Sequence, residues 1–102
     1  MILVAGFVDF DTTNLAAIQA DIRAIEVATR QEDGCLYYAM AFDDPATGHV
    51  TVLERWRDQA ALDAHLRTPG LKTFQQRNLA HARQVSIKAY DASGERDVEV
   101  PD

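Results

Sequence analysis

Residues 52–68, VLERWRDQAALDAHLRT, predict a β-strand that runs directly into a short helix. Glu54 and Trp56 are two positions apart, so their side chains project from the same face of that strand. On the helix, His65 lies beside a stripe of leucines that we expect to be buried. A carboxylate, an indole and an imidazole are therefore expected to meet where the strand joins the helix.

The segments before this stretch predict a strand, a helix and a β-hairpin. Residues 2–10, ILVAGFVDF, are apolar at both odd and even positions, which is typical of a strand buried on both faces. Apolar residues then recur at helical spacing, and we expect this helix to run about five turns and to stop at Gly34. Residues 35–43 and 49–57 predict two strands, joined by the turn sequence DDPATG.

The strand at residues 35–43 has no polar face. Strict alternation places Tyr38 and Met40 on one face and Cys35 and Tyr37 on the other. Since Cys35 is the only cysteine, an internal disulfide is excluded, and the sequence fits a reducing compartment such as the cytoplasm.

The segments after the opening stretch complete the pattern. A Pro-Gly pair breaks the short helix, residues 71–83 predict a further helix, and residues 84–90 predict a fourth strand. The order β-α-β-β-α-α-β predicts a ferredoxin-like α+β domain at residues 1–90, with a four-stranded antiparallel sheet and helices on one face. Residues 91–102 are acidic and mostly polar, and we expect them to form a tail.

The helix-free face of this sheet is also predicted to be apolar, because the first two strands carry apolar side chains at both parities. An exposed apolar patch of that size is unusual on a monomer. Two such sheets packed face to face would bury it, so we expect a homodimer with two-fold symmetry.

Charge and hydropathy exclude other classes of partner. The net charge is −6 and no cluster of Lys or Arg is present, which argues against a nucleic-acid partner. No apolar run is long enough to span a bilayer, and the N-terminus lacks the positively charged region of a signal peptide. We therefore expect a cytoplasmic protein that binds neither nucleic acid nor a membrane.

Two stretches, EVATRQEDGCLYYAMAFDDP and LERWRDQAALDAHLRTPGLKTF, resemble the antibiotic biosynthesis monooxygenase (ABM) family. This family belongs to a superfamily of dimeric α+β barrels that also includes quinol monooxygenases and haem-degrading proteins. Its pattern is a Glu, a Trp two residues later, an Asp that opens a helix and a His near the end of that helix. Glu54, Trp56, Asp58 and His65 match this pattern, and the resemblance covers roughly residues 1–90.

His65 is the candidate for acid–base chemistry, because the ordinary pKa of an imidazole lies near neutrality. Glu54 is expected to hydrogen-bond to this ring and to orient it. A purely structural pair at the edge of the core is the other interpretation, and the sequence leaves both open. Trp56 is expected to form a wall against which a flat ring can stack. The other candidate substrate-binding residues are Tyr38, Met40, Phe74 and Asn78.

No cofactor or metal is expected, because the sequence has neither metal-ligand spacing nor a nucleotide-binding glycine motif. The resemblance then implies an oxidoreductase that uses O₂ to oxidise a small electron-rich aromatic substrate, such as a quinol or an anthrone, with no cofactor. Two alternatives remain. One is a dimeric small-molecule-binding protein without turnover, and the other is a haem-binding or haem-degrading protein that uses His65.

Overall fold

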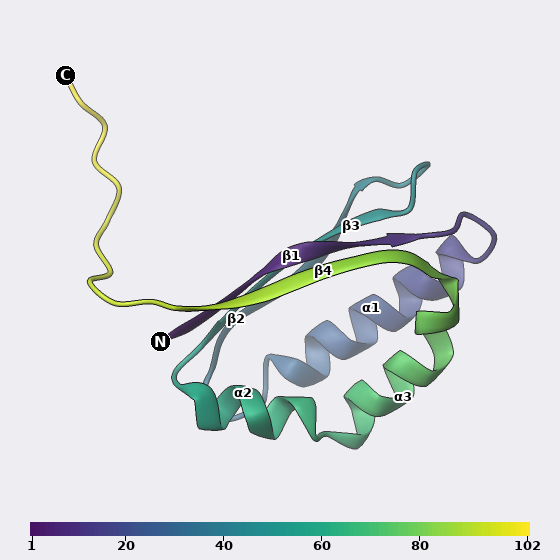
Figure 1. The fold of residues 1–102 in the computed structure, drawn as a ribbon, viewed down its shortest axis with the longest axis horizontal. Helices are drawn as coiled ribbons and strands as arrows, with labels where there is room; N and C mark the ends of the chain where they lie inside the picture. Colours follow the sequence, from purple (N-terminus) through teal and green to yellow (C-terminus); the bar gives the residue numbers. More distant parts are fainter.

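The computed structural model describes residues 1–102 and has two layers, a four-stranded antiparallel sheet and a layer of helices on one of its faces (Figure 1). The predicted ferredoxin-like α+β class is confirmed. The elements in chain order are β1 (Ile2–Phe10), α1 (Leu15–Thr29), β2 (Cys35–Asp44), β3 (His49–Trp56), α2 (Gln59–Leu66), α3 (Pro69–Asn78), a 3₁₀ turn (Leu79–His81) and β4 (Ala82–Asp91).

The sheet has the strand order β2-β3-β1-β4, so β1 lies between β3 and β4. Alternate residues of β1, including Val4 and Val8, are buried beneath the helices, whereas the residues between them are only partly buried. β4 forms one edge of the sheet, and Val85 and Ile87 on its inner face are about half exposed, at 51% and 43%. The helices therefore cover the centre of the sheet and leave the inner face of β4 partly open.

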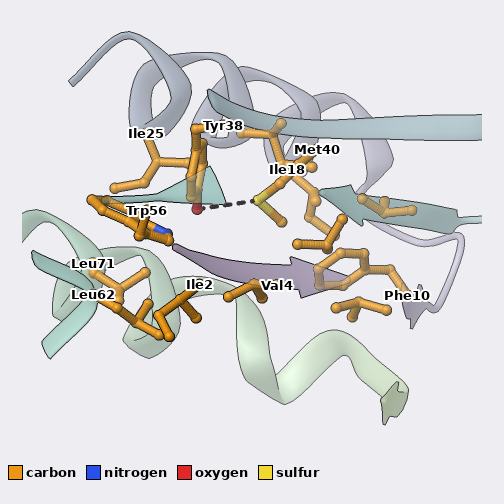
Figure 2. Packing of buried hydrophobic residues seen from close by; sticks show 14 of the residues in the cluster. Ile2, Val4, Phe10, Ile18, Ile25, Tyr38, Met40, Trp56, Leu62 and Leu71 are labelled. Atoms are coloured by element: carbon orange, nitrogen blue, oxygen red, sulfur yellow. Dashed lines mark hydrogen bonds between the residues drawn. The ribbon is translucent and has the colours of Figure 1, made fainter. Parts of the chain in front are cut away.

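One buried apolar cluster fills the space between the sheet and the helices (Figure 2). α1 supplies Ile18, Ile22 and Ile25, which follow the helical spacing seen in the sequence. Trp56 and Phe10, which come from the ends of β3 and β1, are among its largest fully buried side chains. Trp56 is thus a core residue that pairs with Cys35 of β2 and packs against His65 of α2.

β2 contains a β-bulge at its start, so the predicted assignment of its side chains to the two faces of the sheet is wrong there. Cys35 pairs with Trp56, but Tyr37 pairs with Arg55, so Leu36 is an extra residue in the ladder. Cys35 therefore lies on the core side with Tyr38, not on the side of Tyr37, and it packs against the apolar cluster. Strict alternation could not predict this shift, because a bulge leaves no mark in an apolar sequence.

The first helix also ends earlier than predicted. α1 stops at Thr29 rather than at Gly34. Short-range hydrogen bonds then carry the chain through a turn, with the N–H of Glu32 donating to the carbonyl of Thr29 at 3.0 Å. Gly34 has a φ of +82°, and a Cβ there would collide with Ala61 of α2, so glycine is required where this turn meets β2. The turn brings Glu32 against α2.

The two helices after β3 each begin at a residue whose side chain forms an N-cap. The side chain of Asp58 accepts a hydrogen bond from the N–H of Ala61, and Thr68 does the same for Leu71 at the start of α3. The helix predicted for residues 71–83 spans Pro69–Asn78 instead, because a 3₁₀ turn follows and β4 begins at Ala82.

The two ends of the folded chain meet beside each other. The N–H of Ala92 donates to the carbonyl of Met1 at 2.9 Å, which extends the pairing of β1 with β4. Residues 92–102 form no helix or strand, and they lead away from the sheet (Figure 1). None of the helices has the length and apolar character needed to cross a membrane.

Candidate functional site

His65 is held on the inner face of α2 and is only 2% exposed. Its ring lies 4.7 Å from that of Trp56, centroid to centroid, at a tilt of 30°. The ring of Tyr38 meets it edge-on at 5.4 Å. These two aromatic contacts fix the orientation of the imidazole.

The hydrogen-bond partner of His65 is Glu32, not Glu54 as predicted. The Nδ1 atom lies 2.9 Å from Oε1 of Glu32, whose side chain is 23% exposed. A carboxylate only accepts hydrogen bonds, so Nδ1 carries the proton, and a neutral ring keeps its lone pair on Nε2. Glu32 comes from the turn after α1, and no periodicity relates it to a residue 33 positions later.

Glu54 lies on the inner face of β3 and is 7% exposed. Its Oε1 atom accepts a hydrogen bond of 2.9 Å from the indole N–H of Trp56. Burial raises the pKa of Glu54, while the indole N–H and the nearby imidazole of His65 oppose part of that rise. The predicted convergence of carboxylate, indole and imidazole is therefore present, but Trp56 is the residue that bonds to Glu54.

A cavity of about 250 Å³ lies between the sheet and the helices α2 and α3. Its lining is mostly apolar, and His65, Glu54 and Tyr38 are the buried ionisable groups that face it. Three of the predicted substrate-binding residues, Tyr38, Met40 and Phe74, also line it. The site therefore offers a base and a carboxyl group to a mostly apolar ligand.

The other two predicted substrate-binding residues do not line the cavity. Trp56 is fully buried behind His65 and supports the ring instead of forming a wall. Asn78 is 2% exposed, and its side-chain amide donates to Asp21 and to the carbonyl of Phe74, each at 3.0 Å. Asn78 thus ties the end of α3 to α1.

Sequence reasoning missed the far wall of the cavity. Ile87 and Ala89 on β4 line it, and Leu66 and Leu79, which are about half exposed, lie at the same cavity. Ile87 and Ala89 share one parity on β4, so the alternation of that strand was the available signal. Leu66 was expected in the buried stripe of its helix, but at 51% exposure it lies where the cavity meets solvent.

A second hollow lies on the other side of the His65–Glu32 pair. This outer groove of about 330 Å³ is lined by Glu32, Arg57, Ala64 and Thr68, among others. His65 lines the inner cavity and Glu32 lines the outer groove, so their hydrogen bond connects the two.

No three His, Cys, Asp or Glu side chains are arranged so that they could hold a metal ion. The remaining histidines lie elsewhere. His49 bonds to Asp9 on the helix-free face of the sheet, and His81 lies 3.3 Å from Asp11 beside the 3₁₀ turn. Only His65 combines burial with contact to a cavity.

Comparison with known proteins supports the architecture along nearly the whole chain. The family model described as antibiotic biosynthesis monooxygenase matches residues 1–77. A crystal structure of a proposed antibiotic biosynthesis monooxygenase from Deinococcus radiodurans has a TM-score of 0.87 and 28% sequence identity, covering 97% of this chain and 99% of that chain. A second crystal structure, described as an antibiotic biosynthesis monooxygenase, has a TM-score of 0.83 and 29% identity, covering 92% and 100%.

Among curated proteins, an uncharacterized protein of Synechocystis sp. is 33% identical over 63 residues. The match covers 61% of this chain and 43% of that protein, so it spans less than half of the relative's length.

Proposed function

Because the chain belongs to the antibiotic biosynthesis monooxygenase family, we propose that it is a cofactor-independent monooxygenase that acts on a small electron-rich aromatic substrate, of the quinol or anthrone type, with O₂. The observation that carries this proposal is the placement of His65. Its Nδ1 is bonded to Glu32, and the ring lines an apolar cavity.

In this proposal His65 acts as the base. Nε2 takes a proton from a hydroxyl or an acidic ring carbon of the substrate, and the carboxylate of Glu32 stabilises the resulting imidazolium. The deprotonated ring is richer in electrons, so it can reduce O₂ and form a carbon–oxygen bond with it. The proton then returns to the terminal oxygen of the peroxide. Loss of a second proton from the same substrate carbon forms a carbonyl as the O–O bond breaks, and the departing hydroxide takes up that proton and leaves as water. The substrate supplies all the electrons for this reaction.

The apolar lining supports the same chemistry, because it excludes water from the deprotonated substrate and from the peroxide. It also limits the size of the ligand. A volume of about 250 Å³ lies below the ~300–1,000 Å³ typical of sites for drug-sized ligands. This volume suits a small ring compound such as a quinol or an anthrone, whereas it is small for a haem.

The direct test is oxygen consumption with a panel of quinols and anthrones. We expect uptake with at least one compound, and we expect His65→Ala to lower kcat by ~10²–10⁴-fold, the usual contribution of general acid–base catalysis. His81→Ala is the matched control, because His81 lies outside the cavity and should leave the rate unchanged. Tight binding of these compounds without oxygen uptake would instead identify a binding protein.

We also propose that the protein is a homodimer joined through the helix-free face of the sheet. Tyr37, Leu53 and Tyr90 are 47%, 39% and 50% exposed, and all three lie on that face by their pairing registers. Covering such a face would remove apolar surface from water, which favours association.

A further inference from the structure

We propose that Glu54 is a neutral carboxylic acid that donates a hydrogen bond to the ligand, and that the cavity therefore recognises aromatic compounds with two oxygens on adjacent or peri ring positions. One oxygen would face His65 and the other would face Glu54. This inference rests on the proposed function, because it names the substrate class of the same site, but it can be tested without turnover.

The two oxygens of Glu54 are in different situations. Oε1 accepts from the indole N–H of Trp56, whereas Oε2 has no protein partner. The residue is 7% exposed and lines the cavity, so this second oxygen has the cavity as its surroundings. Oε2 is not among the fully buried atoms without a partner, so it is accessible, and a ligand in the cavity can bond to it in place of water.

The surroundings of Glu54 favour its neutral form. A buried carboxylate needs a cation or several donors, and Glu54 has one neutral donor. The titratable groups that interact with it or share its cavity are Cys35 and Tyr38 on β2, His65 on α2, Glu32 in the turn after α1 and Lys88 on β4. Burial is the main cause of the raised pKa of Glu54, and the negative charge of Glu32 adds to it, while the indole N–H of Trp56 and the imidazole of His65 oppose part of the rise.

A hydrogen-bond donor and a hydrogen-bond acceptor then face one ligand. Glu54 presents an O–H group, and His65, whose Nδ1 is bonded to Glu32, offers Nε2 to the cavity. A substrate hydroxyl can donate to the imidazole, and a second oxygen can accept from the carboxyl.

The positions of the Glu54 carboxyl group and the His65 imidazole determine which ring positions of the ligand should bear oxygen. Glu54 contacts the indole of Trp56 through Nε1, and His65 packs on the same indole at 4.7 Å. Both polar groups therefore lie at one end of the cavity. The rest of the lining is mostly apolar, with Val8, Phe10 and Leu79 among its residues, and its two other polar residues, Gln75 and Lys88, are exposed.

The protonation state can be measured directly by infrared spectroscopy. We expect the difference spectrum between the wild-type protein and Glu54→Gln at neutral pH to contain the C=O stretch of a protonated carboxyl group. That band should shift when 2,3-dihydroxynaphthalene is added. A carboxylate band in its place would overturn the assignment, whatever the activity of the protein.

The ligand class can be measured by calorimetry with two isomers. We expect the wild-type protein to bind 2,3-dihydroxynaphthalene about tenfold more tightly than 2,6-dihydroxynaphthalene, which is the contribution of one well-made hydrogen bond. Glu54→Gln should keep most of this preference, because an amide can accept from Trp56 and still donate to the ligand. Glu54→Leu should lose it. The thermal midpoint of each variant shows that it is folded.

The pH dependence of this preference separates a neutral acid from an ionised one. The preference of the wild-type protein should fall as the pH rises through the ionisation of Glu54, whereas that of Glu54→Gln should stay constant. Equal affinity of the wild-type protein for the two isomers, or loss of the preference in Glu54→Gln, would overturn the proposal. If the preference holds but no oxygen is consumed, the proposed monooxygenase function fails and the assignment of Glu54 stands.

Discussion

The imidazole of His65 and the carboxylate of Glu32 are joined by a 2.9 Å hydrogen bond, and each group faces a different hollow of the molecule. The imidazole is buried at the inner cavity, while the carboxylate lies at a groove that is open to solvent. Glu32 is therefore a positioning residue that small solutes can reach from outside. This access gives a way to test its role chemically.

We expect Glu32→Ala to lower kcat by ~10²-fold, because the ring loses both its orientation and the charge that stabilises the imidazolium. Added formate should restore activity in proportion to its concentration, since a small carboxylate can enter the outer groove of about 330 Å³. Asp63→Ala is the matched control on α2. Asp63 bonds only to Gln59, so its loss should neither slow the enzyme nor create a response to formate. A Glu32→Ala protein with full activity would remove Glu32 from the mechanism.

The raised pKa of Glu54 predicts a specific effect of pH on stability. Its ordinary value is 4.5, and burial raises it in the folded state. The folded protein therefore holds this proton more tightly than the unfolded chain, and the resulting stabilisation is lost as pH rises through the folded pKa. Glu54→Gln cannot ionise, so its free energy of unfolding should rise relative to wild type above pH 4.5. Urea unfolding at several pH values measures this difference, with Glu99→Gln in the tail as the control.

Gly6 marks a close approach of two strands. A Cβ at this position of β1 would overlap the backbone of Ser86 and Ile87 on β4. We expect Gly6→Ala to lower the free energy of unfolding by roughly 1–3 kcal/mol, as overpacking does. Gly70→Ala is the control, because the nearest atom to its Cβ lies at 3.8 Å and alanine favours the helix by about 1 kcal/mol. Chemical denaturation should give effects of opposite sign, and equal effects would contradict this account of Gly6.

Thr29 carries a hydroxyl that the fold does not use. The residue is fully buried at the end of α1, and its Oγ1 atom has no hydrogen-bond partner. Thr29→Val keeps the shape and removes the unpaired oxygen, so it should raise the free energy of unfolding by ~1 kcal/mol. Thr29→Ala, which removes a buried methyl as well, should not show this gain. A loss of stability in Thr29→Val would mean that the hydroxyl has a partner in solution.

The proposed dimer can be broken on the helix-free face. We expect light scattering to report a dimer for the wild-type protein, with ~1,200–2,000 Å² buried in total. Leu53→Asp places a charge at the centre of that face and should yield a folded monomer, as shown by its circular dichroism. Val27→Asp is the control, because Val27 is 65% exposed on α1 and lies on the other side of the molecule. A monomeric wild-type protein would contradict the dimer.

The sequence predicted most of the fold because its periodicities are strong. The period-2 pattern of residues 49–57 and the period-3.6 pattern of α1 each identify one element, and Asp58 marks a helix start through its capping chemistry. The bulge at Leu36 was missed, since both parities of β2 are apolar and an extra residue changes nothing in the pattern. Periodicity describes only neighbours along one element.

The site was predicted in part for the same reason. Glu54, Trp56 and His65 lie close together in sequence, and their convergence followed from one strand and one helix. The bond between His65 and Glu32 depends on how α1 ends and turns, which no local spacing records. Asn78 was assigned to the pocket because it lies on an apolar stripe, but its partner Asp21 on α1 becomes a neighbour only in three dimensions.

The pairing of β1 with β4 has a consequence for how the chain reaches this structure. The register joins Ile2 to Asp91. The inner strand β1 therefore cannot pair with β4 until nearly all of the domain has been synthesised. Closing so long a loop is costly in entropy, so we expect this pairing to form later than the local β2–β3 hairpin. Until Asp91 leaves the ribosome, β1 presents an unpaired edge that another nascent chain could join. We therefore expect a chain that lacks β4 to aggregate more readily than the full domain, because β1 would keep its unpaired edge.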